Sequence, residues 1–293
     1  MQGSVGTLWL TALEWMVWRT RCLHVIGKGR LLLALSPRDG ERVVPIIGDY
    51  RLLLDLGDHL QRLMYLGLLH HDLLPAFRLL LPPGGTFLDV GANIGFFTLY
   101  GQHCVGEEGR VIAIEAIPRT FAKLLDSLDR NRLDRVEAHC LALCDSDGPF
   151  VLHVPPAALK KDYLVSHHAE GWEPVTVPGR TLASLLDEQS IACVDFMKID
   201  IEGAEPLVFA AAESVLRAGR VRAMMCEFTG AHLAVHGLTV DEAVDRVLGL
   251  GFRLVAFGRD GQLHECKRTP RFDDRRDYNL LFRHESSLSK QDN

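Results

Sequence analysis

The sequence predicts an α/β protein in which helices cover both faces of an open sheet, with a smaller α+β extension at the N-terminus. Three stretches predict this fold, because each is a short apolar run followed by a glycine turn or an acidic residue and then by a helical pattern. They read TFLDVGANIGFFTLY at residues 86–100, VIAIEAIPRTFAKL at residues 111–124 and DFMKIDIEGAEPLVF at residues 195–209. Strands that alternate with helices in this way favour a largely parallel sheet.

Length and composition limit the class of protein. The chain has 293 residues, a net charge of −6 and 47% hydrophobic residues, which suits one large globular domain with an extension. Because the charge is mildly acidic and no basic block occurs, we expect no nucleic-acid partner. The seven cysteines are scattered and form no C-x-x-C pair. They indicate neither a zinc site nor a disulfide framework, and they favour the reducing cytoplasm.

The first part of the chain predicts a separate cap. Residues 8–18 are apolar, but a charged residue interrupts them and the run is too short to span a bilayer. Their helical spacing favours an amphipathic helix packed on the core, with docking on a membrane surface as the alternative. Short β-like runs at residues 29–57 predict an antiparallel meander. The Pro-Pro-Gly-Gly cluster at residues 82–85 then separates a cap of residues 1–81 from a main domain of residues 82–293.

The turn in the first stretch has the chemistry of a ligand site. Gly91 and Gly95 lack a Cβ, so a ligand can approach closely, and the helix that follows presents unpaired N–H groups to a carboxylate. A dinucleotide site needs a third glycine where Asn93 stands. A ligand with one carboxylate and a positive centre fits better, because Asp89 can face its ammonium group. S-adenosylmethionine is such a ligand, and Ala92 completes its expected contacts; a purely structural turn is the alternative.

The next two strands extend this site. Glu115 ends the second apolar strand, where an acidic residue can accept hydrogen bonds from both ribose hydroxyls. A third strand near residues 136–140 leads into a loop that contains Ala142, Leu143 and Cys144. Loops at the carboxyl ends of parallel strands line the ligand crevice, so we expect Ala142 and Leu143 to border the adenine.

Acidic residues gather at the end of the third stretch. Asp200, Glu202 and Glu205 follow a buried strand, with Lys198 inside it, and Glu227 lies near the end of the next strand. Some of this charge complements a helix N-terminus. The number of carboxylates exceeds what capping requires, so the sequence predicts an acidic rim on the crevice.

Four motifs carry a resemblance to a known family: FLDVGANIGFFTL, VIAIEAIP, TLASLL and DFMKIDIEGAE, in this order. They resemble the FkbM-type family of S-adenosylmethionine-dependent methyltransferases over residues 82–228, and YNLLFR at residues 278–283 resembles it more loosely. The resemblance implies a class I methyltransferase fold, a Rossmann-like seven-stranded sheet, and methyl transfer to a hydroxyl of a small molecule such as a sugar or a polyketide. It places Asp200 beside the transferred methyl. By position it assigns the cofactor to Asp89, Gly91, Asn93, Gly95 and Glu115.

The chain departs from the family in one place. Ala116 and Ile117 follow Glu115, where members usually have proline and asparagine. The expected ribose contact is unaffected, but the packing against adenine differs.

Methyl transfer from a sulfonium is an in-line displacement, so the protein must orient the acceptor oxygen and accept its proton. Asp200 is the first candidate for the base or the orienting group, and Glu227 lies at a neighbouring strand end. Alternatively, these two carboxylates share a Mg²⁺ ion, which prefers such oxygens. The long irregular segment at residues 157–179 adds His168 as a candidate base and Trp172 as a surface for stacking an acceptor.

Three functions are compatible with these features. The preferred one is O-methylation of a small hydroxylated molecule, and the others are methylation of a protein or nucleic acid and non-catalytic binding of the cofactor. Against nucleic acid stand the net charge of −6 and the sequence Asp200-Ile201-Glu202, where an Asn/Asp-Pro-Pro-aromatic motif would be expected. Against a non-catalytic role stands the intact acidic rim.

Overall fold

The computed structural model describes residues 32–33, 36–69, 73–156, 171–267 and 269–288. Two compact units make up the chain, Met1–Pro75 and Ala76–Asn293. The division lies inside helix α4 (Leu74–Leu80), a few residues before the Pro-Pro-Gly-Gly cluster at which the sequence places its boundary. The amphipathic helix expected at residues 8–18 and the candidate base His168 lie outside the described residues.

The described part of the first unit contains a β-hairpin and a short helix. Strands β1 (Glu41–Ile47) and β2 (Tyr50–Asp55) pair in antiparallel fashion, and helix α3 (His59–Tyr65) follows. The first of the expected β-like runs is not a strand where it is described, because Leu32 and Leu33 are helical. Leucine is a strong helix former, so a run of leucines does not by itself indicate a strand.

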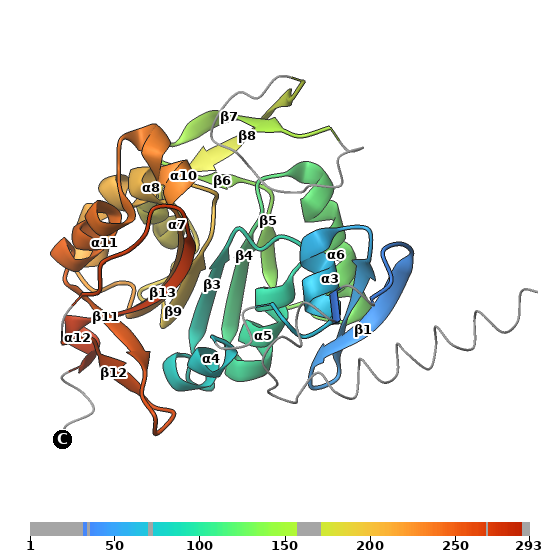
Figure 1. Ribbon diagram of the computed structural model, residues 1–293, viewed down its shortest axis with the longest axis horizontal. Helices are drawn as coiled ribbons and strands as arrows, with labels where there is room; N and C mark the ends of the chain where they lie inside the picture. Colours follow the sequence, from blue (N-terminus) through green and yellow to red (C-terminus); the bar gives the residue numbers. More distant parts are fainter. Residues whose placement is uncertain (1–31, 34–35, 70–72, 157–170, 268, 289–293) are drawn as a thin grey trace, which may run out of the picture. The chain divides into compact units, whose positions relative to one another are not determined.

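The main sheet of the second unit has eight strands in the order β12-β11-β13-β10-β9-β3-β4-β5 (Figure 1). Strands β5, β4, β3, β9 and β10 run parallel, whereas β13 lies antiparallel between β10 and β11. The strands are β3 (Thr86–Val90), β4 (Arg110–Ile114), β5 (Glu137–His139), β9 (Phe196–Ile199), β10 (Ala223–Thr229), β11 (Phe252–Phe257), β12 (Leu263–Glu265) and β13 (Asp277–His284).

This sheet confirms the α/β architecture and corrects the expected number of strands. The seven expected strands are present, and β12 adds an eighth by pairing with β11 at the edge. With only three residues, β12 is too short to show an alternating pattern in the sequence.

Helices pack against both faces of the sheet, as expected. Leu88 and Val90 of β3 belong to a buried cluster with residues of α7, α8, α9 and α11. Phe87 lies on the opposite face, where its ring contacts Phe77 of α4, and Phe77 stacks on Phe97 of α5. None of the described helices is long and apolar enough to cross a membrane. The helices of this unit after α4 are α5 (Phe96–Val105), α6 (Pro118–Arg130), α7 (Leu182–Glu188), α8 (Glu205–Ala211), α9 (Glu213–Arg217), α10 (Gly230–Leu233), η2 (Ala234–His236), α11 (Val240–Gly249) and α12 (Glu285–Leu288).

A second, smaller sheet lies beyond β5 in the chain. Strands β6 (Ala142–Leu143), β7 (Gly148–Val154) and β8 (Glu173–Arg180) form it in the order β6-β8-β7. β7 and β8 are antiparallel and place Leu152, Val154 and Val177 in an apolar cluster that also contains Ala116 and Ile117. The two residues that depart from the family pattern are therefore buried beneath this hairpin, which explains why they are apolar.

Candidate functional site

The turn between β3 and α5 is held by its contact with the end of β9. Gly91, Asn93 and Gly95 have φ angles of 75°, 52° and 96°, in the left-handed region that favours glycine and asparagine. A Cβ on Gly91 would lie 1.9 Å from the carbonyl oxygen of Asp200. The sequence predicts that Gly91 is a glycine because a ligand approaches it closely. The structure gives a second reason for a glycine there, because the backbone of Asp200 passes too close to leave room for a Cβ.

Asp89 lies under this turn. Its side chain is 0% exposed, and its Oδ2 accepts a hydrogen bond of 2.6 Å from Oγ1 of Thr98. Its Oδ1 is buried without a hydrogen-bond partner among the described residues. Burial raises the pKa of Asp89, an effect that Lys198 partly offsets. The structure thus places this carboxylate in the support of the turn, and its expected contact with a ligand ammonium stays a prediction.

Lys198 connects the turn to the acidic rim. It is the register partner of Asp89 on β9, and its Nζ donates to the carbonyl oxygen of Gly91 at 2.7 Å and lies 3.2 Å from Oδ2 of Asp200. Burial alone would lower its pKa, but the carboxylates of Asp200 and Asp89 raise the pKa of Lys198 overall. The ammonium therefore remains charged and ties Gly91 to Asp200.

Glu115 stands beside the turn with hydrogen-bonding capacity to spare. Its Oε2 accepts the N–H of Asn93 at 2.9 Å and its Oε1 accepts the N–H of Ile117 at 2.8 Å. Each carboxylate oxygen has a second lone pair, so two further donors can bind. Burial raises the pKa of Glu115 to about 7, because these two bonds only partly compensate the lost hydration. A pair of ribose hydroxyls would supply the missing donors, so the residues present fit the cofactor.

The two residues expected beside the adenine form strand β6. Ala142 belongs to the small apolar cluster with Ala116 and Ile117, whereas Leu143 packs in the main hydrophobic core. Both are buried. Ala142 shares its cluster with Ala116, the neighbour of Glu115, and an adenine wall formed by Ala142 and Leu143 stays a prediction.

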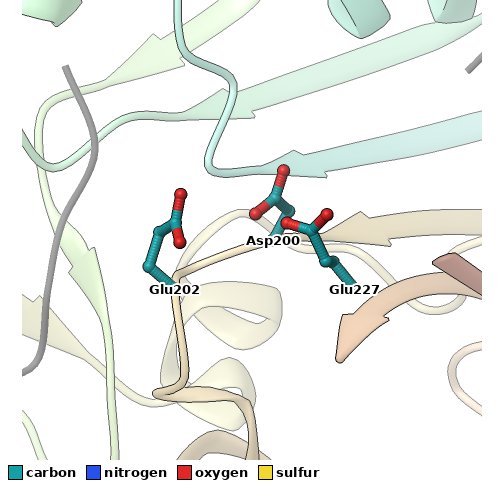
Figure 2. Close-up of side chains that lie close together, drawn as sticks. All are labelled: Asp200, Glu202 and Glu227. Atoms are coloured by element: carbon teal, nitrogen blue, oxygen red, sulfur yellow. The ribbon is translucent and has the colours of Figure 1, made fainter. Parts of the chain in front are cut away.

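The structure brings the expected acids together. Asp200 and Glu202 follow β9, Glu227 lies on β10, and Figure 2 shows the carboxyl groups of Asp200 and Glu227 next to one another with that of Glu202 to one side. One oxygen of each lies within 4.8 Å of the others. Glu205 plays a different part: it is buried at the start of α8 and accepts the N–H of Ile201 at 2.8 Å. The acidic rim therefore consists of Asp200, Glu202 and Glu227.

Protons keep this acidic rim from carrying three full charges. Burial and then the charge of Asp200 raise the pKa of Glu227 to about 10, and the two side chains are hydrogen-bonded. Asn279 on β13 also donates to Oε1 of Glu227 at 3.1 Å. Burial raises the pKa of Glu202 to about 8, with Asp200 as the next cause. Near neutral pH, Glu227 holds its proton and Glu202 titrates just above neutrality.

Sequence reasoning missed two members of the site. Asn279 reaches Glu227 because β13 pairs with β10 in a register that places the two residues opposite one another, and the sequence does not show that register. His232, in α10, has Nδ1 3.2 Å from Oε2 of Glu202. A histidine that follows the carboxyl end of a parallel strand is a recognisable signal. The signal was present in the sequence just after β10.

The Mg²⁺ alternative gains little from this geometry. Asp200, Glu202 and Glu227 bring three carboxyl oxygens together. Acidic groups often gather in this way without an ion, and among the described residues nothing further points to a cation. Mg²⁺ at the acidic rim therefore stays a hypothesis from the sequence.

The fold and the site together define a class. Seven strands in the order β5-β4-β3-β9-β10-β13-β11, a glycine turn after β3 and an acid after β4 form a class I, S-adenosylmethionine-dependent methyltransferase. The family model described as the methyltransferase FkbM domain matches residues 89–254, more than half of the chain. The chain belongs to the FkbM family of methyltransferases.

Individual relatives are distant. The 31-O-demethyl-FK506 methyltransferase FkbM of Streptomyces tacrolimicus is 27% identical over 206 residues, which cover 60% of this chain and 75% of that protein. Methyltransferase 1 of Beauveria bassiana (strain ARSEF 2860) is 24% identical over 142 residues, 42% of this chain and 57% of that protein.

Two solved structures are similar as well. The methyltransferase FkbM of Methylobacillus flagellatus KT is 12% identical, covers 95% of this chain and 60% of its own, and has a TM-score of 0.43. The O-methyltransferase of Bacillus cereus in complex with SAH is 15% identical, covers 71% of this chain and 78% of its own, and has a TM-score of 0.39.

Proposed function

We propose that this protein transfers a methyl group from S-adenosylmethionine to a hydroxyl of a small molecule. One observation carries the proposal: the carboxyl groups of Asp200, Glu202 and Glu227 converge at the strand end whose backbone touches Gly91 in the cofactor turn. A cofactor over that turn would therefore lie next to a cluster able to accept hydrogen bonds from a hydroxyl. The name of the Streptomyces relative supports oxygen as the acceptor atom.

The cofactor would be held by the turn and by Glu115. The carboxylate end suits the N–H groups at the start of α5, and the ribose hydroxyls suit the unused lone pairs of Glu115. Ala142 and Leu143 would border the adenine, and Asp89 would support the turn from below. When bound, S-adenosylmethionine supplies a methyl group that is already activated by its sulfonium.

The acidic rim would bind and orient the acceptor. Asp200 is held in place by Lys198 at 3.2 Å and by its hydrogen bond with Glu227, so its carboxylate is a fixed acceptor for a substrate hydroxyl. Orientation of this kind contributes ~7–11 kcal/mol in well-aligned systems. A small hydroxylated molecule, not a nucleic acid, is the substrate class that suits an acidic mouth, since phosphates would be repelled.

A screen of acceptors tests the proposal. The native protein is incubated with S-adenosylmethionine carrying a labelled methyl group and with panels of sugars, polyketides and other hydroxylated compounds, and products are identified by mass spectrometry. We expect a labelled methyl ether. Calorimetry with S-adenosylmethionine and with NAD⁺ runs beside the screen. Binding of NAD⁺ alone, or a labelled product only on protein or nucleic acid, would overturn the proposal.

A further inference from the structure

His232 forms a pair with Glu202 at the edge of the acidic rim. The imidazole Nδ1 lies 3.2 Å from Oε2 of Glu202, and the two side chains are 19% and 26% exposed. Glu202 in turn has an oxygen within 4.8 Å of Asp200 and Glu227. The imidazole therefore lies next to one member of the acidic rim.

The backbone around Glu202 is shaped to make this pair. Glu202 has a φ of 56° and Gly203 a φ of 100°, so two consecutive residues are left-handed. For a residue with a side chain this conformation is unfavourable and persists only where the surroundings enforce it. A Cβ on Gly203 would lie 2.6 Å from the Cβ of His232. The glycine of the IEGAE motif thus allows the loop after β9 to close on His232.

The carboxyl groups of the acidic rim are poorly placed to take a proton from a substrate. The charge of Asp200 is paired with Lys198, and Asp200 is also hydrogen-bonded to Glu227. A proton on Asp200 would have to displace one of these partners. Glu227 already holds a proton near neutral pH. An imidazole beside a carboxylate is the usual solution when a hydroxyl must lose its proton.

We propose, resting on the methyl transfer proposed above, that His232 is the base of the reaction and that the charge of Glu202 stabilises its protonated ring. As the acceptor oxygen forms its bond to the methyl carbon, the sulfur–methyl bond breaks and its electron pair stays on sulfur. The hydroxyl proton moves to Nε2 of His232, and the carboxylate of Glu202, 3.2 Å from Nδ1, stabilises the imidazolium that forms. The imidazolium then gives this proton to water, which restores the neutral imidazole before the next turnover.

Glu202 titrates just above neutral pH. Asp200, Glu205 and Asp277 act on Glu202 with like charge, Lys198 acts with opposite charge, and with burial the net result is a pKa of about 8 for Glu202. Below that pH Glu202 is neutral and gives little stabilisation to a protonated His232. Above it, the carboxylate of Glu202 lies 3.2 Å from Nδ1 and favours the imidazolium that proton transfer creates. Turnover should therefore rise as the pH rises through about 8.

Nitrogen NMR of the full chain tests the pair without any substrate. With ¹⁵N-labelled histidine, we expect the ring-nitrogen shifts of the native His232 to change as the pH rises through about 8, because Glu202, 3.2 Å from Nδ1, gains its charge there. Glu202→Gln should abolish this change. Asp260→Asn is the matched control, because Asp260 and His264 form an exposed pair at 2.9 Å elsewhere on the chain. A titration of His232 that is the same in the native chain and in Glu202→Gln would overturn the proposal.

Kinetics with an acceptor from the screen test the base itself. We expect His232→Gln to lower kcat by ~10²–10⁴-fold, the usual share of a general base, while calorimetric affinity for S-adenosylmethionine stays within a few-fold. His264→Gln should keep the native kcat. Absence of product from the native chain would overturn the proposed function. Product formed by the native chain and equally by His232→Gln would overturn this inference alone.

Discussion

Replacing Gly91 with alanine should lower the free energy of unfolding for two reasons. The first is conformational: Gly91 has a φ of 75°, and a left-handed residue with a Cβ costs ~1–2 kcal/mol. The second is steric, because the new Cβ would lie 1.9 Å from the carbonyl oxygen of Asp200, which is backbone and cannot rotate away. Overpacking of this kind typically costs ~1–3 kcal/mol.

Gly84 provides the matched control for Gly91. Its φ is 73°, nearly the same, but a Cβ there would meet nothing within 4 Å. We therefore expect Gly84→Ala to lose ~1–2 kcal/mol of unfolding free energy and Gly91→Ala to lose roughly 2–5 kcal/mol. Urea unfolding followed by circular dichroism measures both, and calorimetry should show weakened S-adenosylmethionine binding for Gly91→Ala alone. Equal losses of stability in the two variants would refute the steric argument.

Three further substitutions test the site. Glu115→Ala should weaken S-adenosylmethionine binding by ~1–3 kcal/mol, the cost of unpaired buried groups. The control Glu108→Ala, at an exposed position, should leave this affinity unchanged. If calorimetry gives the two variants the same affinity, Glu115 does not bind the ribose. Asp200→Asn should keep that affinity within a few-fold but lower turnover by ~10²-fold through a misplaced acceptor, and unchanged turnover would remove Asp200 from the mechanism. The folded chain holds a proton on Glu227 that the unfolded chain releases above a pKa of 4.5, so stability should fall as the pH rises from 4.5 toward about 10. Glu227→Gln should make that fall shallower in urea unfolding, and an identical slope would contradict the pKa shift.

The parts of the fold that the sequence predicts are those with a local signal. The runs at β3, β4 and β9 are continuous and apolar, and each is followed by a turn that glycine or an acid marks, so strand, turn and helix could be identified together. Leu32 and Leu33 show the limit of this reasoning, because leucine fits a buried helix as well as a strand. The short strand β12 shows another limit, since its pairing with β11 rather than its composition makes it a strand.

The candidate site likewise contains residues whose meeting the sequence predicts and others whose meeting it does not. Asp200 and Glu227 could be expected to meet because they lie near the carboxyl ends of neighbouring parallel strands. Asn279 could not, because its place depends on the register of an antiparallel strand far along the chain. The close contact between Gly91 and Asp200 could not be predicted either. A glycine at such a position is explained equally well by a bound ligand or by a neighbouring segment of the chain.

The position of β13 has a consequence for how the protein matures. β13 follows β11 and β12 in the chain but lies between β10 and β11 in the sheet (Figure 1). Until residues 277–284 have left the ribosome, β10 and β11 cannot be joined, and a nascent chain exposes the edge of β10 that carries Glu227. The acidic rim, whose Glu227 accepts a hydrogen bond from Asn279 of β13, is therefore completed after the glycine turn, late in synthesis.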